Sequence, residues 1–203
     1  MPRDKSDTHI RVMDAAKKVF LEKGFEKASI RDIASAAGIT SAGLYRHCKD
    51  KEDLFCRVVE PAICALELWG KNHMKNSYDS LENKDFNGLR SQSEIDMIRE
   101  VVLPYRKEFL LILTKSAGTK YENFIHDMVN DHETGMLEGL KKIEEHGFKV
   151  KKVNREELHI IISAYVTALF EPVIHDYDLE KIEHYLDTVE TFFMPGWHDL
   201  LGI

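Results

Sequence analysis

The sequence predicts an all-α protein, in which an N-terminal three-helix helix-turn-helix domain is joined by a long helix to a C-terminal helical domain. Apolar residues recur at helical spacing through nearly every segment, and no convincing alternating strand appears. Residues 29–55 predict two short helices joined by a tight glycine turn, followed by the capped start of a third. The length of 203 residues permits two small domains, which we place at 1–55 and 56–203.

The first helix is expected over residues 7–23. Its apolar side chains share one helical stripe: Ile10, Met13, Ala16 and Phe20. Gly24 is expected to end this helix, with Phe25 placed to fold back in a Schellman-type contact.

The second and third helices are predicted from their caps and from the turn between them. Ser29 is a good N-cap, and Asp32 takes the capping-box position three residues later. Gly38 permits the left-handed backbone that closes the second helix, and Thr40 caps the third. The core-facing residues of the second helix are Ile30, Ile33, Ala34 and Ala37. Those of the third, inward or along its edge, are Leu44, Tyr45 and Cys48.

A long fourth helix is expected to begin after Asp50, a cap that has Asp53 three residues later. Its apolar periodicity continues through Leu54, Val58, Ile63 and Leu66. Pro61 interrupts this helix and predicts a kink, because proline removes one backbone hydrogen bond. Such a kink either transmits motion between the domains or belongs to a merely curved connecting helix.

The rest of the chain predicts further helices after a loop-like stretch at 76–93. They are expected near 92–103, 105–117, 120–146, 154–175 and 178–194. Residues 158–170 are apolar almost all round, which is typical of a helix buried on more than one side. The last helix should end at Pro195, and it carries an apolar stripe of Leu179, Ile182, Leu186, Val189 and Phe193. These two helices suit a helix-bundle dimer interface, with the core of a lone domain as the alternative.

Charge is distributed unevenly along a chain whose formal net charge is −7. Residues 1–60 hold 12 Lys and Arg against 10 Asp and Glu, whereas residues 61–203 hold 16 against 25. Because salt screens charges beyond roughly 8–10 Å, the local balance of the N-terminal region matters more than the sum. A polyanionic partner is therefore compatible with the acidic total.

The cysteine count and the absence of a long apolar run predict a cytoplasmic protein. Cys48, Cys56 and Cys64 form no CxxC pair, which fits a reducing compartment and buried or half-buried structural thiols. No run of about 18 apolar residues predicts a membrane span. The first residues lack the apolar core of a signal peptide.

Residues 15–55, AAKKVFLEKGFEKASIRDIASAAGITSAGLYRHCKDKEDLF, resemble the DNA-binding domain of the TetR-like (tetracycline-repressor-like) transcriptional regulators. The IAxxAG turn, the LYRH end of the recognition helix and the KxxLF start of the fourth helix fall in register. The remaining 140 or so residues resemble the family only in helix count and length. Cys48 departs from the pattern, because the family commonly has a larger, aromatic residue there.

The resemblance implies that the third helix lies in the major groove of DNA. Its leading edge would be Thr40, Ser41, Ala42 and Gly43. The phosphate contacts would come from Tyr45, Arg46 and His47, with Arg31 and Lys51 clamping the flanking backbone. Alternatives stay open for single residues. Tyr45 could belong to the core, and His47 could be an ordinary surface histidine. Arg46 and Lys51 could be solvated only, and Arg31 could read a base or pair with an acid.

The resemblance also implies that the larger domain binds a small-molecule effector and forms a homodimer. The candidate pocket residues are Trp69, His73, Phe109, Tyr121, Phe124, Tyr165 and Phe170, each of which could equally be ordinary core. Glu67 and Glu171 lie within apolar stretches, where a carboxylate would suit a cationic lipophilic ligand if it faces inward.

Other functional classes find little support in the sequence. His126 and His132 are six residues apart, which is not a helical chelate spacing, so neither a metal nor another cofactor is expected. No GxSxG, P-loop or GxGxxG motif points to an enzyme. The sequence predicts a homodimeric repressor that binds palindromic operator DNA and is released by a small molecule. The alternative is an architectural or chromosome-organising helix-turn-helix protein without an effector.

Overall fold

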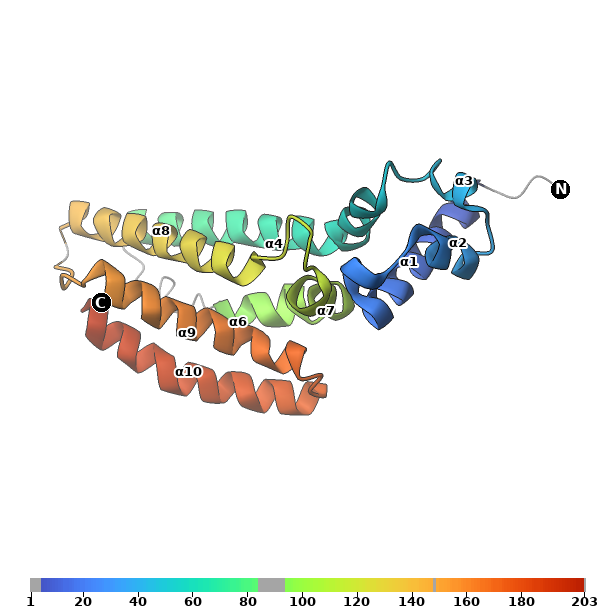
Figure 1. The fold of residues 1–203 in the computed structure, drawn as a ribbon. Helices are drawn as coiled ribbons and strands as arrows, with labels where there is room; N and C mark the ends of the chain where they lie inside the picture. The colour runs from blue at the N-terminus through green and yellow to red at the C-terminus, as the bar shows by residue number, and fades with distance from the viewer. Residues whose placement is uncertain (1–4, 84–93, 148, 203) are drawn as a thin grey trace. The chain divides into compact units, whose positions relative to one another are not determined.

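The computed structural model describes residues 5–83, 94–147 and 149–202, and these residues form helices joined by turns (Figure 1). The elements in chain order are α1 (Lys5–Lys27), α2 (Ile30–Ala36), α3 (Ser41–Leu44), α4 (Lys51–Glu82), α6 (Glu94–Met97), the π-helical turn η1 (Ile98–Val102), α7 (Arg106–Lys115), α8 (Phe124–Glu145), α9 (Arg155–Ile174) and α10 (Leu179–Leu201). No strand occurs in the described ranges, so the predicted all-α class is confirmed.

The chain divides into two compact units. Unit 1 comprises Met1–Glu67 and Val102–Glu122, and unit 2 comprises Leu68–Val101 and Asn123–Ile203. Helix α4 therefore contributes residues to both units. The predicted functional boundary after residue 55 stays a prediction, because a compact unit need not coincide with a functional domain.

Unit 1 is built around α1, which packs against both α2 and α7, while α2 packs against α3. Its interior includes the fully buried side chains of Phe20, Ile33, Leu44, Leu54 and Phe55. The rings of Phe20 and Phe55 meet edge to face with their centroids 5.1 Å apart, an arrangement that aromatic pairs favour. This core holds the short α2 and α3 in place, since helices of this length have little stability alone.

Helix α7 belongs to unit 1 although it lies far from α1 in the sequence. Its apolar face, including Phe109 and Leu111, is buried. Glu108 of α7 is also buried, and its carboxylate accepts a hydrogen bond from the Lys17 ammonium of α1. A buried carboxylate needs such a partner, because an unpaired charge in the interior is strongly disfavoured.

Helix α1 agrees with the prediction at Gly24 and differs from it at Ile10. Gly24 has φ 75°, so the regular helix is interrupted there before one further turn. Ala16 and Phe20 are buried as expected. Ile10 is 59% exposed, because the buried face of α1 runs through Val12 and Val19 instead.

Helix α4 continues without a break through Pro61 and ends at Glu82, so the predicted loop is wrong for residues 76–82. The remainder of that stretch, 84–93, lies outside the described residues. Tertiary contact explains the extra turns, because the Lys142 ammonium of α8 lies 3.2 Å from the centroid of the Tyr78 ring. The Ser77 hydroxyl also donates to the His73 carbonyl within the helix.

Unit 2 places α9 between α8 and α10, each of which packs against it (Figure 1). Its core includes Ile162, Tyr165 and Phe170 from α9. Three of the predicted apolar stripe residues of α10, Ile182, Leu186 and Val189, are buried, Phe193 is half-buried and Leu179 is exposed.

Helix α10 passes through Pro195 and ends at Leu201, so the predicted stop at Pro195 is wrong. Proline removes the hydrogen bond from its own nitrogen to the carbonyl four residues earlier. The turns beyond it bury Trp197 and Leu201, and Trp197 meets Tyr165 edge to face with ring centroids 6.0 Å apart. That burial offsets the missing bond.

Helix α9 is long and apolar enough to cross a membrane by length and composition alone. It is the one helix in the described part of the chain that meets this test, and 44% of the window concerned is buried inside the fold. Core helices of soluble proteins meet the same test, so this helix is weak support for a membrane span.

Candidate nucleic-acid interface

The segment from α2 to α3 is fixed by three local devices that the sequence predicts. The Ser29 hydroxyl accepts from the Asp32 amide at 3.1 Å, and the Asp32 carboxylate accepts from the Ser29 amide at 3.2 Å, completing a capping box. Gly38 turns the chain with φ 65°, a backbone conformation that side chains disfavour. The Thr40 hydroxyl then accepts from the Gly43 amide at 3.0 Å and caps α3.

Packing leaves one side of this segment open to solvent. Ile33, Ala34 and Leu44 are buried against the rest of unit 1. The residues that stay exposed on α2, on the turn and on α3 with its following turn include Arg31, Thr40, Ala42, Tyr45 and Arg46. The outward surface of α3 is therefore small side chains followed by a tyrosine and an arginine.

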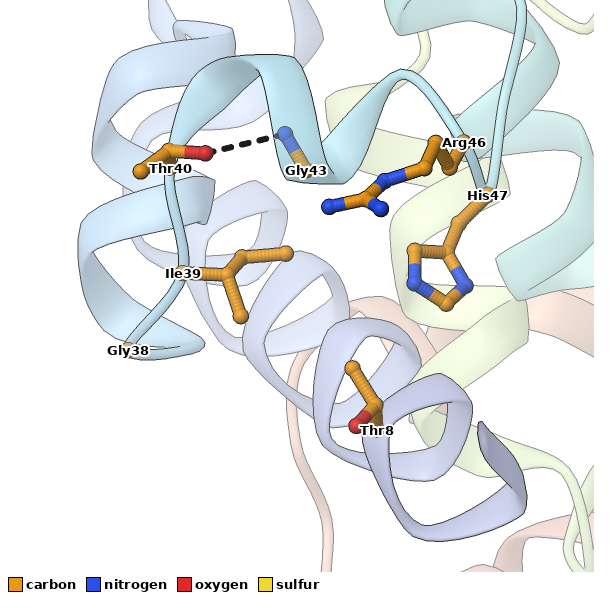
Figure 2. A pocket seen from close by; sticks show the side chains of 7 residues that line it. All are labelled: Thr8, Gly38, Ile39, Thr40, Gly43, Arg46 and His47. Carbon is orange, nitrogen blue, oxygen red and sulfur yellow. Dashed lines mark hydrogen bonds between the residues drawn. The ribbon is translucent and has the colours of Figure 1, made fainter. Parts of the chain in front are cut away.

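A groove of about 710 Å³ runs between α3 and the start of α1 (Figure 2). It is lined by Thr8, Gly38, Ile39, Thr40, Gly43, Arg46 and His47, none of which carries a carboxylate. The Arg46 side chain extends back beside α3, and a Cβ built on Gly43 would lie 3.8 Å from its Nη2 atom (Figure 2). Hydroxyl, guanidinium and imidazole groups around an acid-free hollow are suited to an anion such as phosphate.

His47 is the titratable residue of this groove. Its ring lies 5.9 Å from the ring of His9, measured between centroids. Burial lowers the pKa of His47, and the positive charges of His9 and Arg46 lower that pKa further. The imidazole is thus biased toward its neutral form when no anion is present.

Lys51, at the start of α4, is committed to the protein backbone. Its ammonium donates to the carbonyl oxygens of Phe25, Glu26 and Ala28 at 2.7, 3.2 and 3.1 Å. It also lies 4.3 Å from the centroid of the Phe25 ring. An ammonium has three hydrogens to donate, so these carbonyls account for all of them.

Comparison with known proteins agrees with this geometry. The model of the bacterial regulatory proteins of the tetR family matches residues 12–58, which include α2, α3 and the turn between them. The transcriptional repressor KstR2 of Rhodococcus jostii is 30% identical over 106 residues, 51% of each chain. Residues 12–58 of the chain are therefore similar to the DNA-binding region of the tetR-family regulators.

Over the whole length of the chain, the likeness to known proteins rests on the fold. The chain spans about half or less of the length of the curated relatives that it matches, 51% for KstR2 and 27% for another. Native NalD, the secondary repressor of the MexAB-OprM multidrug efflux pump in Pseudomonas aeruginosa, has a TM-score of 0.59 at 18% identity over 98% of both chains. AibR in complex with isovaleryl coenzyme A and operator DNA has a TM-score of 0.54 at 20% identity, over 92% of this chain and 98% of that one. At these identities the two structures support a shared fold.

The structure brings most of the predicted TetR-type contact residues together. Thr40, Gly43, Arg46 and His47 line the groove, while Ala42 and Tyr45 face outward beside it. Tyr45 is 54% exposed, which argues against the core position that the sequence left open. Ser41 is half-buried, and Arg31 is exposed on α2. Their contact with DNA stays a prediction.

Lys51 stands apart from this set, because its donors are used within unit 1. The structure gives its ammonium a structural role, and its predicted role at a phosphate remains untested. Thr8 and His9 were missed by the sequence analysis. No local motif marks them, and only the fold brings the first turns of α1 beside the residues that follow α3.

The predicted effector residues divide between the two units. Phe109 and Tyr121 belong to unit 1, where Phe109 is fully buried and Tyr121 is half-buried. The other five belong to unit 2: Trp69, His73, Phe124, Tyr165 and Phe170. Their binding of an effector stays a prediction.

Within unit 2 some of these candidates contact one another, and Tyr165 contacts the carboxylate of Glu94. The rings of Trp69 and His73 stack with centroids 4.6 Å apart. The Tyr165 hydroxyl donates to Glu94 at 3.3 Å, and His132 Nδ1 lies 3.9 Å from the other oxygen of that carboxylate. Among the described residues, no cluster of three or more histidine, cysteine or acidic side chains is arranged to hold a metal ion.

The three cysteines differ in exposure. Cys48 is buried, Cys56 is half-buried and Cys64 is exposed, so the expectation of buried or half-buried thiols is wrong for Cys64. Burial raises the pKa of the Cys48 thiol, which keeps it protonated and unreactive. The smaller residue at this position is thus still covered by the surrounding packing.

Proposed function

We propose that this protein is a TetR-like, cytoplasmic transcriptional repressor that binds palindromic operator DNA as a homodimer and is released by a small molecule. The observation that carries the proposal is the acid-free groove beside α3, in which Arg46 and His47 lie next to the Thr40 cap. The names of two similar proteins support the sign of regulation, since KstR2 and NalD are both described as repressors.

In this proposal α3 enters the major groove of DNA. The small side chains of Ala42 and Gly43 allow close approach of the backbone to the base edges, and the Ser41 hydroxyl meets a base or a phosphate. Arg46, His47 and Tyr45 bind phosphate oxygens. Arg31, exposed at the start of α2, reaches the flanking strand.

A second copy of the chain is the proposed partner of α9 and α10. Ile160 of α9 is 68% exposed and Phe192 of α10 is 75% exposed, so both large apolar side chains are available to a partner. A two-fold axis would let the same two helices of each copy cover one another, because a symmetric dimer uses one patch twice. The dimer would also present two copies of α3 to the two halves of a palindrome.

The effector is proposed to bind in unit 2, among the aromatic side chains around Glu94. The Glu94 carboxylate, the Tyr165 hydroxyl and His132 offer polar contacts, and the Tyr165 ring packs beside that of Phe193. The AibR complex with isovaleryl coenzyme A and operator DNA supports effector control on this fold. A ligand can shift the DNA affinity only by its own preference for one conformation, typically by about 1–3 kcal/mol.

The test is selection of duplexes from a random-sequence pool by the purified full chain, followed by binding measurements on the enriched sequence. We expect an enriched inverted repeat that is bound by two copies of the chain. Enrichment of sequences without two-fold symmetry, or enrichment of none, would overturn the proposal.

A further inference from the structure

The geometry of unit 1 points to a DNA phosphate subsite that α1 shares with the turn after α3. We propose that Thr8 and His9 bind one backbone phosphate together with Arg46 and His47, and that this subsite makes DNA affinity rise as the pH falls. The inference rests on the proposed function. It adds contacts from α1, which lies outside the α2–α3 segment, and a dependence of DNA affinity on pH.

Two parts of the chain far apart in sequence build the subsite. Thr8 lies in the first turns of α1 and lines the same groove as Arg46 and His47 (Figure 2). His9 follows Thr8, is exposed, and places its ring 5.9 Å from that of His47 with the two planes tilted by 32°. The His9 ring therefore lies beside His47, which lines the groove together with Arg46.

Among the described residues, the groups whose charge acts on His47 are basic, and none of them is a carboxylate. His9 and Arg46 act on it directly. Arg11, the next cation along α1, donates to the Ala37 carbonyl, and a Cβ built on Gly38 would lie 3.1 Å from its Nη2 atom. The seven lining residues include no carboxylate that would neutralise the site internally. An external anion would complement the positive charge of Arg46 and of a protonated His47.

Protonation and phosphate binding favour one another at such a site. Without an anion, a second positive charge beside Arg46 is unfavourable, and burial together with His9 and Arg46 lowers the pKa of His47. A phosphate in the groove reverses the sign of the local field and favours the imidazolium form. DNA binding then takes up protons, so the association constant must rise as the proton concentration rises.

The experiment measures the affinity of the full chain for an enriched duplex by fluorescence anisotropy between about pH 6 and pH 8 at constant salt. Proton uptake raises the association constant by up to about tenfold per pH unit for each proton bound. We expect a clear rise toward acid for the wild type, a smaller one for His9→Gln and for His47→Gln, and almost none for the double variant. His126→Gln, which changes an exposed histidine of α8, should keep the wild-type pH dependence.

A second readout does not depend on affinity. The NMR titration of the His47 ring should show a higher pKa in the DNA complex than in the free protein. An unchanged His47 pKa, or a double variant with the wild-type pH slope, would overturn the subsite while leaving DNA binding itself intact. Failure of the wild type to bind any duplex would instead overturn the proposed function, and the subsite with it.

Discussion

The ammonium of Lys51 lies 2.7 Å from the carbonyl oxygen of Phe25 and ties the start of α4 to the end of α1. The same ammonium reaches the carbonyls of Glu26 and Ala28, which are at the end of a helix where carbonyls lack intrahelical partners. A sequence motif that suggests a phosphate clamp thus includes a residue that holds the domain together.

Lys51→Met should lower the stability of the protein, because it keeps the apolar stem but leaves these carbonyls without the charged donor. Hydrogen bonds to charged groups contribute roughly 1.5–3 kcal/mol, and the partly exposed setting places the expected loss toward the lower end. Urea denaturation followed by circular dichroism gives the free energy of unfolding. Lys49→Met, at an exposed neighbour, should change it by less than about 0.5 kcal/mol.

The salt dependence of DNA binding separates the two roles of Lys51. With the ammonium committed to carbonyls, Lys51→Met should leave the log–log salt slope unchanged at a temperature where it is folded. A slope that falls by about 0.9, the value expected for one phosphate contact, would restore the clamp role.

Thr40→Val should destabilise α3, because valine has the same shape as threonine and lacks the hydroxyl that accepts from the Gly43 amide. Losing an N-cap typically costs about 0.5–2 kcal/mol. The midpoint temperature of thermal unfolding and the DNA affinity should both be lower for Thr40→Val than for the wild type. Thr40→Ser should restore most of both, because serine keeps the hydroxyl. Equal stability of the valine and serine variants would show that the cap hydroxyl does not support α3.

Glu133 should make unit 2 sensitive to acid. The Arg155 guanidinium holds the pKa of the Glu133 carboxyl below its usual value, with a further contribution from His159. A carboxyl with a lowered folded-state pKa stabilises the fold above its unfolded-state pKa, about 4.5, and this stabilisation is lost as the pH falls further.

We therefore expect Glu133→Gln to be less stable than the wild type at neutral pH and to approach it as the pH falls below about 4.5. Chemical denaturation at each pH measures the difference. Glu138→Gln, an exposed position on the same helix, should show no such convergence. A constant gap between Glu133→Gln and the wild type across this range would contradict the assignment.

Ile160→Glu and Phe192→Glu should each weaken the proposed homodimer. Both positions are exposed in the single chain, and the dimer would have to bury the new carboxylate against its partner. We expect at least a tenfold weaker association, equivalent to about 1.4 kcal/mol, in sedimentation equilibrium. Met74→Glu replaces another exposed apolar residue of unit 2, on α4, and should leave the dimer unchanged. If both glutamate variants associate as the wild type does, the interface lies elsewhere.

The parts of the fold that local chemistry determines were predictable from the sequence. Ser29 and Thr40 cap their helices as expected, and Gly38 takes the left-handed backbone of the turn, because each device involves neighbours within four residues. The same locality explains why the interruption at Gly24 was foreseen. These devices place the core of the candidate interface.

The parts that depend on distant contacts were not predictable. Pro195 suggested a helix end, yet burial of Trp197 beyond it carries α10 onward. The three carbonyl partners of Lys51 lie 23 to 26 residues away, and no motif names them. His9 and His47 meet only after α1 and α3 have packed into one unit. Tertiary structure thus decides which of the predicted residues remain available for a ligand.

The most direct test of the account is the affinity of the Arg46→Ala variant for an enriched duplex across a salt titration. Arg46 lines the acid-free groove beside α3, so we expect a folded variant with a Kd at least about tenfold weaker and a salt slope reduced by about 0.9. Lys141→Ala removes an exposed cation from α8 and should retain wild-type affinity and slope. If folded Arg46→Ala binds the duplex with the wild-type affinity and salt slope, the α3 groove is not the DNA-binding surface.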